Sequence, residues 1–173
     1  MKKDFIILMG SDGAGKSTIA EGLSEILGYP VEHHGPVKSH EEGFNEYFNC
    51  VKETNYSVIK DRFYEGERIF APLYRGYEAS YFPYLEQELI EKFNVILVLV
   101  YAPFPVIEKR LEERGEDFVR PEHFRYCFDK VVEIFNDSIL PKMIIDTSLD
   151  TAEENIMKIV KRVVIWVYNP CFF

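Results

Sequence analysis

The chain has 173 residues, of which 47% are hydrophobic and 28% charged, and this is the size and balance of one globular domain with a substantial core. Its formal net charge of -9 argues against a general nucleic-acid-binding surface, and its longest uncharged stretch, residues 94–107, is too short and too interrupted by proline to cross a membrane. The three cysteines, Cys50, Cys127 and Cys171, are odd in number and widely spaced, so we expect reduced thiols in a cytoplasmic protein.

Strand and helix patterns alternate through the first half of the chain. Residues 5–9 form a continuous apolar run, which predicts a strand covered on both faces. A glycine-rich loop follows, and apolar residues then recur at helical spacing as far as Gly28, which predicts a helix over 19–27. The next segments predict a short strand and turn, a helix, a strand and a helix interrupted by Pro72, at 29–36, 40–52, 56–63 and 64–80.

The second half continues the alternation. It predicts three helices and two strands, at 85–93, 95–101, 105–114, 124–135 and 142–145, before a capping box at Thr151–Glu154 opens a last helix. This pattern is typical of an α/β fold, so we predict three layers, a five-stranded parallel sheet with helices on both faces, in a single domain over 1–173. Ligands bind such sheets beyond the carboxyl ends of the strands. The glycine-rich loop, Asp61–Arg62 and Asp146–Thr147 should therefore meet in one cleft.

The loop "GSDGAGKST" satisfies the phosphate-binding pattern G-x-x-x-x-G-K-[ST]. Glycines let the backbone N–H groups surround an anion, and the helix that follows adds the positive end of its dipole. A chance match is the weaker interpretation, because the motif follows a buried strand and opens an amphipathic helix. We expect ATP to be bound by the loop residues Gly10, Ser11, Gly13, Ala14, Gly15, Lys16, Ser17 and Thr18.

The loop alone does not identify a reaction. A GTPase would carry a guanine-reading Asn-Lys-x-Asp sequence after a strand, and "VLVYAPFP" offers none. A motor or helicase would usually be larger. These exclusions leave a small kinase.

The stretch "KDRF" places Asp61 and Arg62 at the end of a strand. There a carboxylate can hold Mg²⁺, and a guanidinium can bind a phosphate through two hydrogen bonds. The alternative is a surface Asp-Arg pair without function. Together with the loop that contains Asp12 and the arginine-bearing segment "KRLEERGEDFVRPEHFR", this motif resembles the thymidylate kinase family, and more broadly the small phage-type deoxynucleoside monophosphate kinases.

The resemblance implies a P-loop kinase fold and a role for each matching residue. Lys16 would bind the donor phosphates, and Ser17 with Asp61 would hold Mg²⁺. Arg62 would bridge the acceptor phosphate and the transferred group, and Asp12 would bind the 3′-hydroxyl of the acceptor sugar. The chain departs from the family at "PLYRG", where Arg75 stands in place of an expected glutamine.

A lid is expected over about 110–121, where three arginines, Arg110, Arg114 and Arg120, surround Gly115. Of these we choose Arg114 as the catalytic, ATP-contacting residue. The alternative is a solvated helix end whose arginines pair with neighbouring glutamates. Thr147, after the last strand, is expected to touch the donor adenine.

The acceptor side is rich in aromatic residues: Phe44, Phe48, Phe63, Tyr64, Phe70 and Tyr74. One should stack on the base, although core packing competes with that role for each ring. We choose Phe63, Phe70 and Arg75, with Asp12 and Arg62, as acceptor-binding residues. At most one of His33 and His34 should edge this site, because neighbours on a strand point to opposite faces.

The sequence therefore predicts Mg²⁺- and ATP-dependent phosphoryl transfer to a deoxynucleoside monophosphate, with dTMP or a modified pyrimidine nucleotide as first choice. One rival is a kinase that phosphorylates a hydroxymethyl group on a pyrimidine within DNA. Another is a nucleotide-binding regulatory module without an acceptor. The apolar segment 163–173 is either a tail packed on the domain or the interface of a homodimer.

Overall fold

The computed structural model describes residues 2–115 and 119–168, without the side chains of 165–168. Five strands form one all-parallel sheet in the order β2-β3-β1-β4-β5. Their bounds are β1 Lys3–Met9, β2 Val31–Glu32, β3 Val58–Asp61, β4 Phe93–Tyr101 and β5 Lys142–Asp146. The predicted parallel sheet is confirmed.

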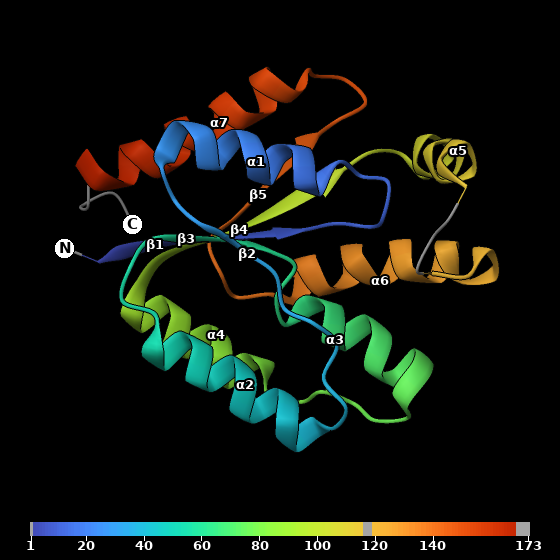
Figure 1. Ribbon diagram of the computed structural model, residues 1–173, viewed down its shortest axis with the longest axis horizontal. Coiled ribbons are helices and arrows are strands. Elements are labelled where there is room, and N and C mark those ends of the chain that lie inside the picture. Colours follow the sequence, from blue (N-terminus) through green and yellow to red (C-terminus); the bar gives the residue numbers. More distant parts are fainter. Residues whose placement is uncertain (1, 116–118, 169–173) are drawn as a thin grey trace.

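Helices cover both faces of the sheet, as Figure 1 shows. On one face lie α1 and α7, and on the other lie α2, α3, α4 and α6, so the fold has three layers. The helices are α1 Lys16–Leu27, α2 His40–Glu53, α3 Glu65–Phe70, α4 Phe82–Lys92, α5 Phe104–Arg114, α6 Phe124–Asp137 and α7 Ala152–Tyr168. The central strands β1 and β4 are buried almost throughout, which explains their continuous apolar sequences.

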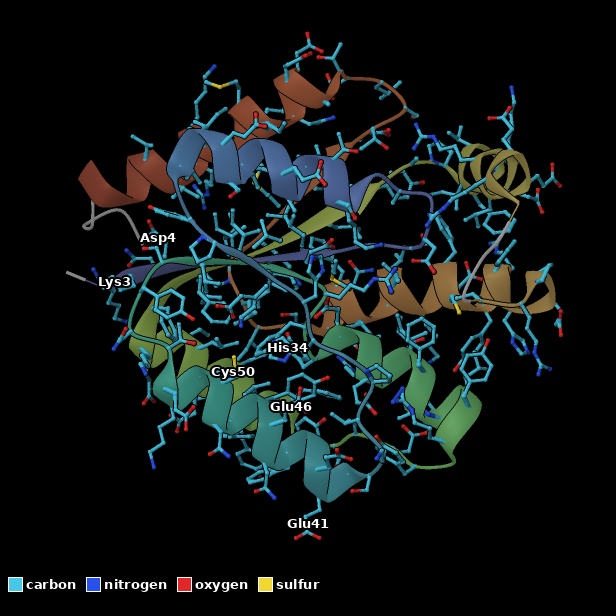
Figure 2. The ribbon with its side chains drawn as sticks, viewed as in Figure 1. Lys3, Asp4, His34, Glu41, Glu46 and Cys50 are labelled. Carbon is cyan, nitrogen blue, oxygen red and sulfur yellow. The ribbon has the colours of Figure 1, made fainter. Side chains whose placement is uncertain are left out.

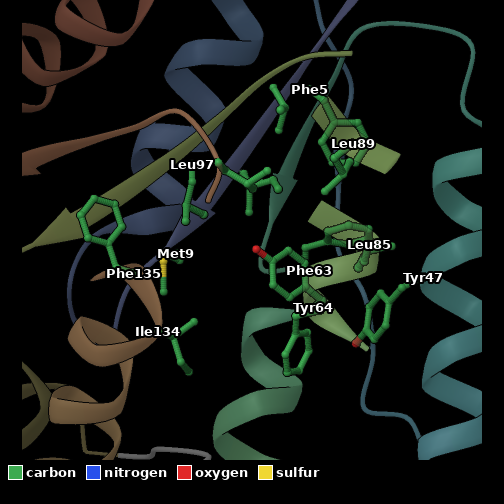
Figure 3. Close-up of a cluster of buried hydrophobic side chains, with 14 of the residues drawn as sticks. Phe5, Met9, Tyr47, Phe63, Tyr64, Leu85, Leu89, Leu97, Ile134 and Phe135 are labelled. Atoms are coloured by element: carbon green, nitrogen blue, oxygen red, sulfur yellow. The ribbon is translucent and has the colours of Figure 1, made fainter. Parts of the chain in front are cut away.

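The core has one cluster of buried side chains on each face of the sheet. The cluster beneath α2, α4 and α6 is strongly aromatic (Figure 3). Within it the Phe63 ring lies 5.5 Å from Phe5 and 5.1 Å from Tyr47, centroid to centroid. Phe63 is therefore mainly a core residue, and this packing fixes the segment that follows Asp61 and Arg62.

Two predicted elements have different bounds. Strand β3 ends at Asp61 rather than continuing to residue 63, because Arg62 has a φ of 70° and leaves the extended conformation. The helix predicted over 64–80 ends at a π-helical turn, Ala71–Arg75, in which the Gly76 N–H donates to the Ala71 carbonyl at 2.8 Å. Gly76 then takes a φ of 74°, which favours glycine and stops the helix.

The last helix begins as predicted. The Glu154 N–H donates to Thr151 Oγ1 at 3.2 Å and the Thr151 N–H donates to Glu154 Oε2 at 2.9 Å, so the capping box is confirmed. Residues 169–173 of the predicted tail or interface lie outside the described part of the chain. Among the residues that the structure describes, no helix has the length and apolarity needed to span a bilayer.

Candidate active site

The phosphate loop joins β1 to α1 at the carboxyl edge of the sheet. Gly10, Gly13 and Gly15 have φ values of 156°, 78° and 95°, and a Cβ on Gly10 would lie only 2.5 Å from the Val100 carbonyl oxygen. The loop therefore needs glycine at these positions. Lys16 Nζ donates to the carbonyls of Gly10 and Ser11, both at 2.8 Å. The ammonium thus lies across the loop that would surround an anion.

Lys16 is almost completely buried. Burial, and then the charge of Arg62, lower the pKa of its ammonium to about 8, against the opposing effects of Asp12 and Asp61. A polyphosphate in the loop would raise this pKa again, because an anion favours the charged form of a neighbouring cation. The loop thus carries a buried cation beside the backbone N–H groups that would surround the anion.

Ser17 and Asp61 meet beside this loop. Ser17 Oγ donates to Asp61 Oδ2 at 3.1 Å, while Asp61 Oδ1 is buried and has no hydrogen-bond partner among the described residues. His33 Nδ1 lies 3.5 Å from Asp61 Oδ2. A hydroxyl and a carboxylate with an oxygen to spare are suitable ligands for a hard cation such as Mg²⁺. The predicted pair therefore comes together with the chemistry that this ion requires.

Arg62 and Asp12 form an ion pair across the cleft, in which Arg62 Nη2 donates to Asp12 Oδ1. The Asp12 carboxylate also lies 3.8 Å from Lys16 Nζ. The acid within the phosphate loop therefore has two cationic partners in the structure.

Glu65 supports the turn that carries Arg62, and the sequence analysis missed it. Its Oε1 accepts a hydrogen bond from the Phe63 N–H at 3.0 Å, and the carboxylate is buried. Burial raises the pKa of Glu65 to about 7, although the Phe63 N–H and the nearby cations favour the charged form. The sequence signal that could have identified Glu65 is its position as an acidic residue in the first turn of the helix after "DRF".

A cavity of about 450 Å³ opens beside Arg62, of a size suited to a small ligand. Its lining combines aromatic rings with charged side chains: His34, Gly35, Pro36, Tyr47, Arg62, Phe63, Gly66, Glu67, Phe70, Tyr74, Arg75 and Arg120. The predicted acceptor residues Phe63, Phe70 and Arg75 are all present. Phe44 and Phe48 are absent from this lining and stack on each other, with centroids 4.3 Å apart.

Arg75 and Glu67 form a fixed pair in the wall of this cavity. Arg75 Nη1 donates to the Val37 carbonyl at 2.7 Å and to Glu67 Oε2 at 3.1 Å, and the Tyr77 hydroxyl donates to Glu67 Oε1. Glu67 was not predicted, because its partners Arg75 and Tyr77 follow α3 and meet it only when the chain has folded. The pair provides both N–H donors and carboxylate acceptors at one place in the wall.

The predicted lid arginines have different surroundings. Arg110 donates to the Gly13 carbonyl at 3.2 Å and to Thr147 Oγ1 and O, both at 2.9 Å. It therefore joins α5 to the phosphate loop and to the segment after β5. Arg114, one turn later, is exposed at the end of α5, and Arg120 lines the cavity beside Arg62. Residues 116–118 of the predicted lid lie outside the described part of the chain.

The fold is shared with several solved structures, kinases among them. The chain is similar to the YorR protein of Bacillus subtilis, solved in complex with phosphorylated GDP, with a TM-score of 0.83, 25% identity and coverage of 95% of this chain and 98% of that one. It is also similar to a deoxyadenosine kinase from M. mycoides, solved with dCMP and dCDP, with a TM-score of 0.62, 19% identity and coverage of 92% and 97%.

A gluconokinase from Sinorhizobium meliloti shares the fold at a TM-score of 0.65, with 14% identity and coverage of 98% of both chains. The chain matches no family model and no curated protein sequence. The phosphate loop, the parallel sheet and these neighbours together identify a P-loop kinase fold.

Proposed function

We propose that the protein transfers the γ-phosphoryl group of ATP to a deoxynucleoside monophosphate, in a reaction that requires Mg²⁺. The observation that carries this proposal is the position of Arg62. It lines the large cavity and also a smaller one, of about 30 Å³, against Gly10, Ser11 and Asp12. A guanidinium shared by the two spaces can contact a donor phosphate on one side and an acceptor phosphate on the other.

In this proposal, the residues around the phosphate loop have separate roles in phosphoryl transfer. The loop from Gly10 to Thr18 holds the donor phosphates through backbone N–H groups, and Lys16 neutralises the charge that they bring. Ser17 and Asp61 hold Mg²⁺, which supplies charge neutralisation and alignment of the phosphates when bound. Arg110 and Thr147 border the donor side, and Arg114 is our proposed lid contact. Catalysis then comes from positioning and electrostatics, without a covalent intermediate.

The cavity beside Arg62 is our proposed acceptor site. An aromatic ring, with Phe70 as our choice, would stack on the base. Arg75 and Glu67 would read a base edge that offers a carbonyl acceptor beside an N–H donor. Thymine has such an edge, so dTMP or a modified pyrimidine nucleotide remains the first choice.

A second acceptor class is favoured by a specific observation. One edge of guanine presents a carbonyl beside an N–H in the same order. It adds an amino group that can donate a hydrogen bond to a carboxylate such as Glu67. YorR, which is similar to this chain over nearly its whole length, was solved with a phosphorylated guanine nucleotide. A guanine deoxynucleotide is therefore the second candidate acceptor.

Asp12 is our proposed ligand of the acceptor's 3′-hydroxyl. A hydrogen bond to a charged group contributes about 1.5–3 kcal/mol, so removing the hydroxyl should lower kcat/KM by about 10- to 100-fold. In the Asp12→Ala variant, dTMP and its 3′-deoxy analogue should react almost equally well. If the variant and the wild type discriminate equally between dTMP and its 3′-deoxy analogue, Asp12 does not have this role.

The decisive experiment supplies ATP, Mg²⁺ and a panel of acceptors to the full chain and measures the labelled product. The panel contains the four deoxynucleoside monophosphates, the matching ribonucleotides and duplex DNA that carries a hydroxymethylpyrimidine. Labelling of a monophosphate alone is expected. Labelled DNA, with binding that weakens steeply with salt, would support the DNA-kinase rival. ATP binding without transfer to any acceptor would support the regulatory module.

A further inference from the structure

A buried lysine that the proposed mechanism does not use lies behind the acceptor site. Lys60, on β3, is fully buried. Its Nζ contacts Glu32 Oε2 at 2.5 Å, His34 Nε2 at 3.1 Å and Cys50 Sγ at 3.1 Å. The three N–H groups of the ammonium thus have three acceptors, from β2, the loop after it, and α2. Figure 2 shows His34 and Cys50 close together between the sheet and α2.

The cluster has the ligand types of a metal site, because one oxygen, one nitrogen and one sulfur atom lie within 4.8 Å of one another. The Lys60 ammonium, however, contacts each of these atoms. A dication would have to displace this fully buried cation. The lysine therefore already supplies the positive charge that these groups require.

The sulfur and the amine nitrogen are in direct contact, and the surrounding groups can accept protons from both. His34 Nε2 lies 3.6 Å from Cys50 Sγ and 3.1 Å from Lys60 Nζ. Burial, and then the Lys60 charge, lower the pKa of His34, so its ring is neutral and Nε2 is available as an acceptor. Cys50 is only half-buried, and its oxidation requires that a small oxidant reaches the sulfur.

We propose that Cys50 and Lys60 form a reversible covalent cross-link when hydrogen peroxide oxidises the cysteine. The Cys50 thiol takes one oxygen from peroxide, becomes a sulfenic acid and releases water. The neutral Lys60 amine, after giving a proton to His34 or Glu32, attacks the sulfur. A sulfur–nitrogen bond forms, the sulfur–oxygen bond breaks, and the hydroxyl leaves as water with the second proton of the amine.

The electrons and atoms balance over the whole sequence. The thiol, the amine and one hydrogen peroxide give the sulfenamide and two waters, so sulfur loses the two electrons that peroxide gains. Two external thiols reverse the reaction and leave with their own disulfide. The cross-link joins α2 to β3 and removes the cation beside His34, which lines the proposed acceptor cavity.

The test uses full-length protein in which Cys171 is replaced by serine, treated with hydrogen peroxide and then examined by intact mass and peptide mapping. We expect the mass of two hydrogen atoms to be lost and a cross-linked peptide pair that contains Cys50 and Lys60, both reversed by dithiothreitol. A cross-linked peptide pair that is heavier by one oxygen atom, taken from a second hydrogen peroxide, would also support the link between Cys50 and Lys60. Cys50→Ser should abolish the product.

Cys127→Ser is the matched control and should cross-link like the parent. The Cys127 thiol is buried, and burial raises its pKa to about 11, which makes it a poor nucleophile. Oxygen addition to Cys50 with an unmodified Lys60 would overturn the proposal, and so would a cross-link that persists in Cys50→Ser. Because the readout is a mass, the result does not depend on the proposed kinase activity.

The functional consequence rests on the proposed function and is measured separately. The cross-linked form should have a KM for the acceptor raised several-fold, with the KM for ATP unchanged, and dithiothreitol should restore it. A confirmed cross-link with unchanged acceptor kinetics would leave the bond established and reject its effect on the site.

Discussion

At the scale of single residues, the backbone conformation of Arg62 tells most about how the site is built. A φ of 70° is unfavourable for a residue with a Cβ and costs about 1–2 kcal/mol. The Arg62 N–H donates to the Leu8 carbonyl at 3.3 Å, and Glu65 accepts from the next N–H along the chain. The fold thus pays a conformational cost to direct this guanidinium toward the phosphate loop.

Replacing Arg62 by lysine keeps the charge and removes the planar pair of donors. We expect kcat/KM to fall at least tenfold, because an ammonium does not reproduce a two-pronged contact. Steady-state kinetics with the acceptor found in the panel measures this, with circular dichroism as the check on folding. A loss of less than about tenfold, or ~1.4 kcal/mol, would mean that Arg62 does not clamp the phosphates.

Glu65 should make the stability of the protein depend on pH. Its pKa rises from 4.5 to about 7 on folding, so between these values the folded state holds more protons than the unfolded one. Stability therefore falls as pH rises through that window. Glu65→Gln should reduce the fall by roughly 3 kcal/mol, from ~1.4 kcal/mol for each pKa unit over a rise from 4.5 to about 7. Urea titrations at pH 4.5 and pH 8 test this, and parallel profiles for variant and wild type would contradict it.

At the scale of helices and strands, the close packing of α1 on α7 depends on a missing side chain. A Cβ on Gly22 would lie 2.3 Å from Ile156 Cδ1. Alanine is favoured over glycine within a helix by about 1 kcal/mol, but overpacking costs about 1–3 kcal/mol. The overlapping Cδ1 is the end of a flexible side chain, but Ile156 is buried in the core, so we expect the cost of repacking it to exceed the gain in helix propensity.

Gly22→Ala should therefore lower the free energy of unfolding by about 1 kcal/mol. Adding Ile156→Val removes the overlapping methyl, so the double variant should be more stable than the sum of the single changes predicts. Denaturant midpoints of the four proteins form the cycle. Strict additivity would show that α7 moves to accommodate the new methyl group.

Local motifs predicted those parts of the site that belong to one segment. The loop from Gly10 to Ser17 and the Asp61–Arg62 step follow buried strands, and their positions follow from where strands end in a parallel sheet. The pairs Arg110–Thr147, Arg75–Glu67 and Lys60–Cys50 were not predicted. Each joins segments whose contact depends on helix packing and strand order, which spacing along the chain does not encode.

At the scale of the whole molecule, the strand order places the proposed donor and acceptor sites on the same edge of one sheet. β1, which leads into the phosphate loop, lies between β3, which ends at Asp61, and β4. In the proposed reaction the two substrates would bind on either side of β1, with α3 on the acceptor side and α5 on the donor side (Figure 1). A ligand that spans both sites should stabilise the molecule more than either half.

An adenosine–thymidine compound joined by five phosphates tests this arrangement. At 100 times its Kd it should add about 2.7 kcal/mol to the free energy of unfolding, which raises Tm by roughly 5–10 °C for a domain of this size. ATP or dTMP at the same concentration should give smaller shifts.

Lys16→Ala should fold normally and lose both this shift and phosphoryl transfer, as thermal melts and a kinase assay would show. An active, ligand-stabilised Lys16→Ala protein would reject the phosphate-loop assignment.

The pairing of Arg62 with Asp12 should affect how fast bound ATP is hydrolysed when no acceptor is present. Water is present in large excess and is a competing acceptor of the phosphoryl group. While Asp12 holds the guanidinium, the clamp is not free to stabilise the transition state of hydrolysis. In the proposed reaction, an acceptor would exchange both partners at once, by offering a phosphate to Arg62 and a hydroxyl to Asp12. Asp12→Asn should therefore release phosphate from ATP faster than the wild type without acceptor, as a coupled phosphate assay would show. An unchanged rate would mean that idle turnover is suppressed by other groups.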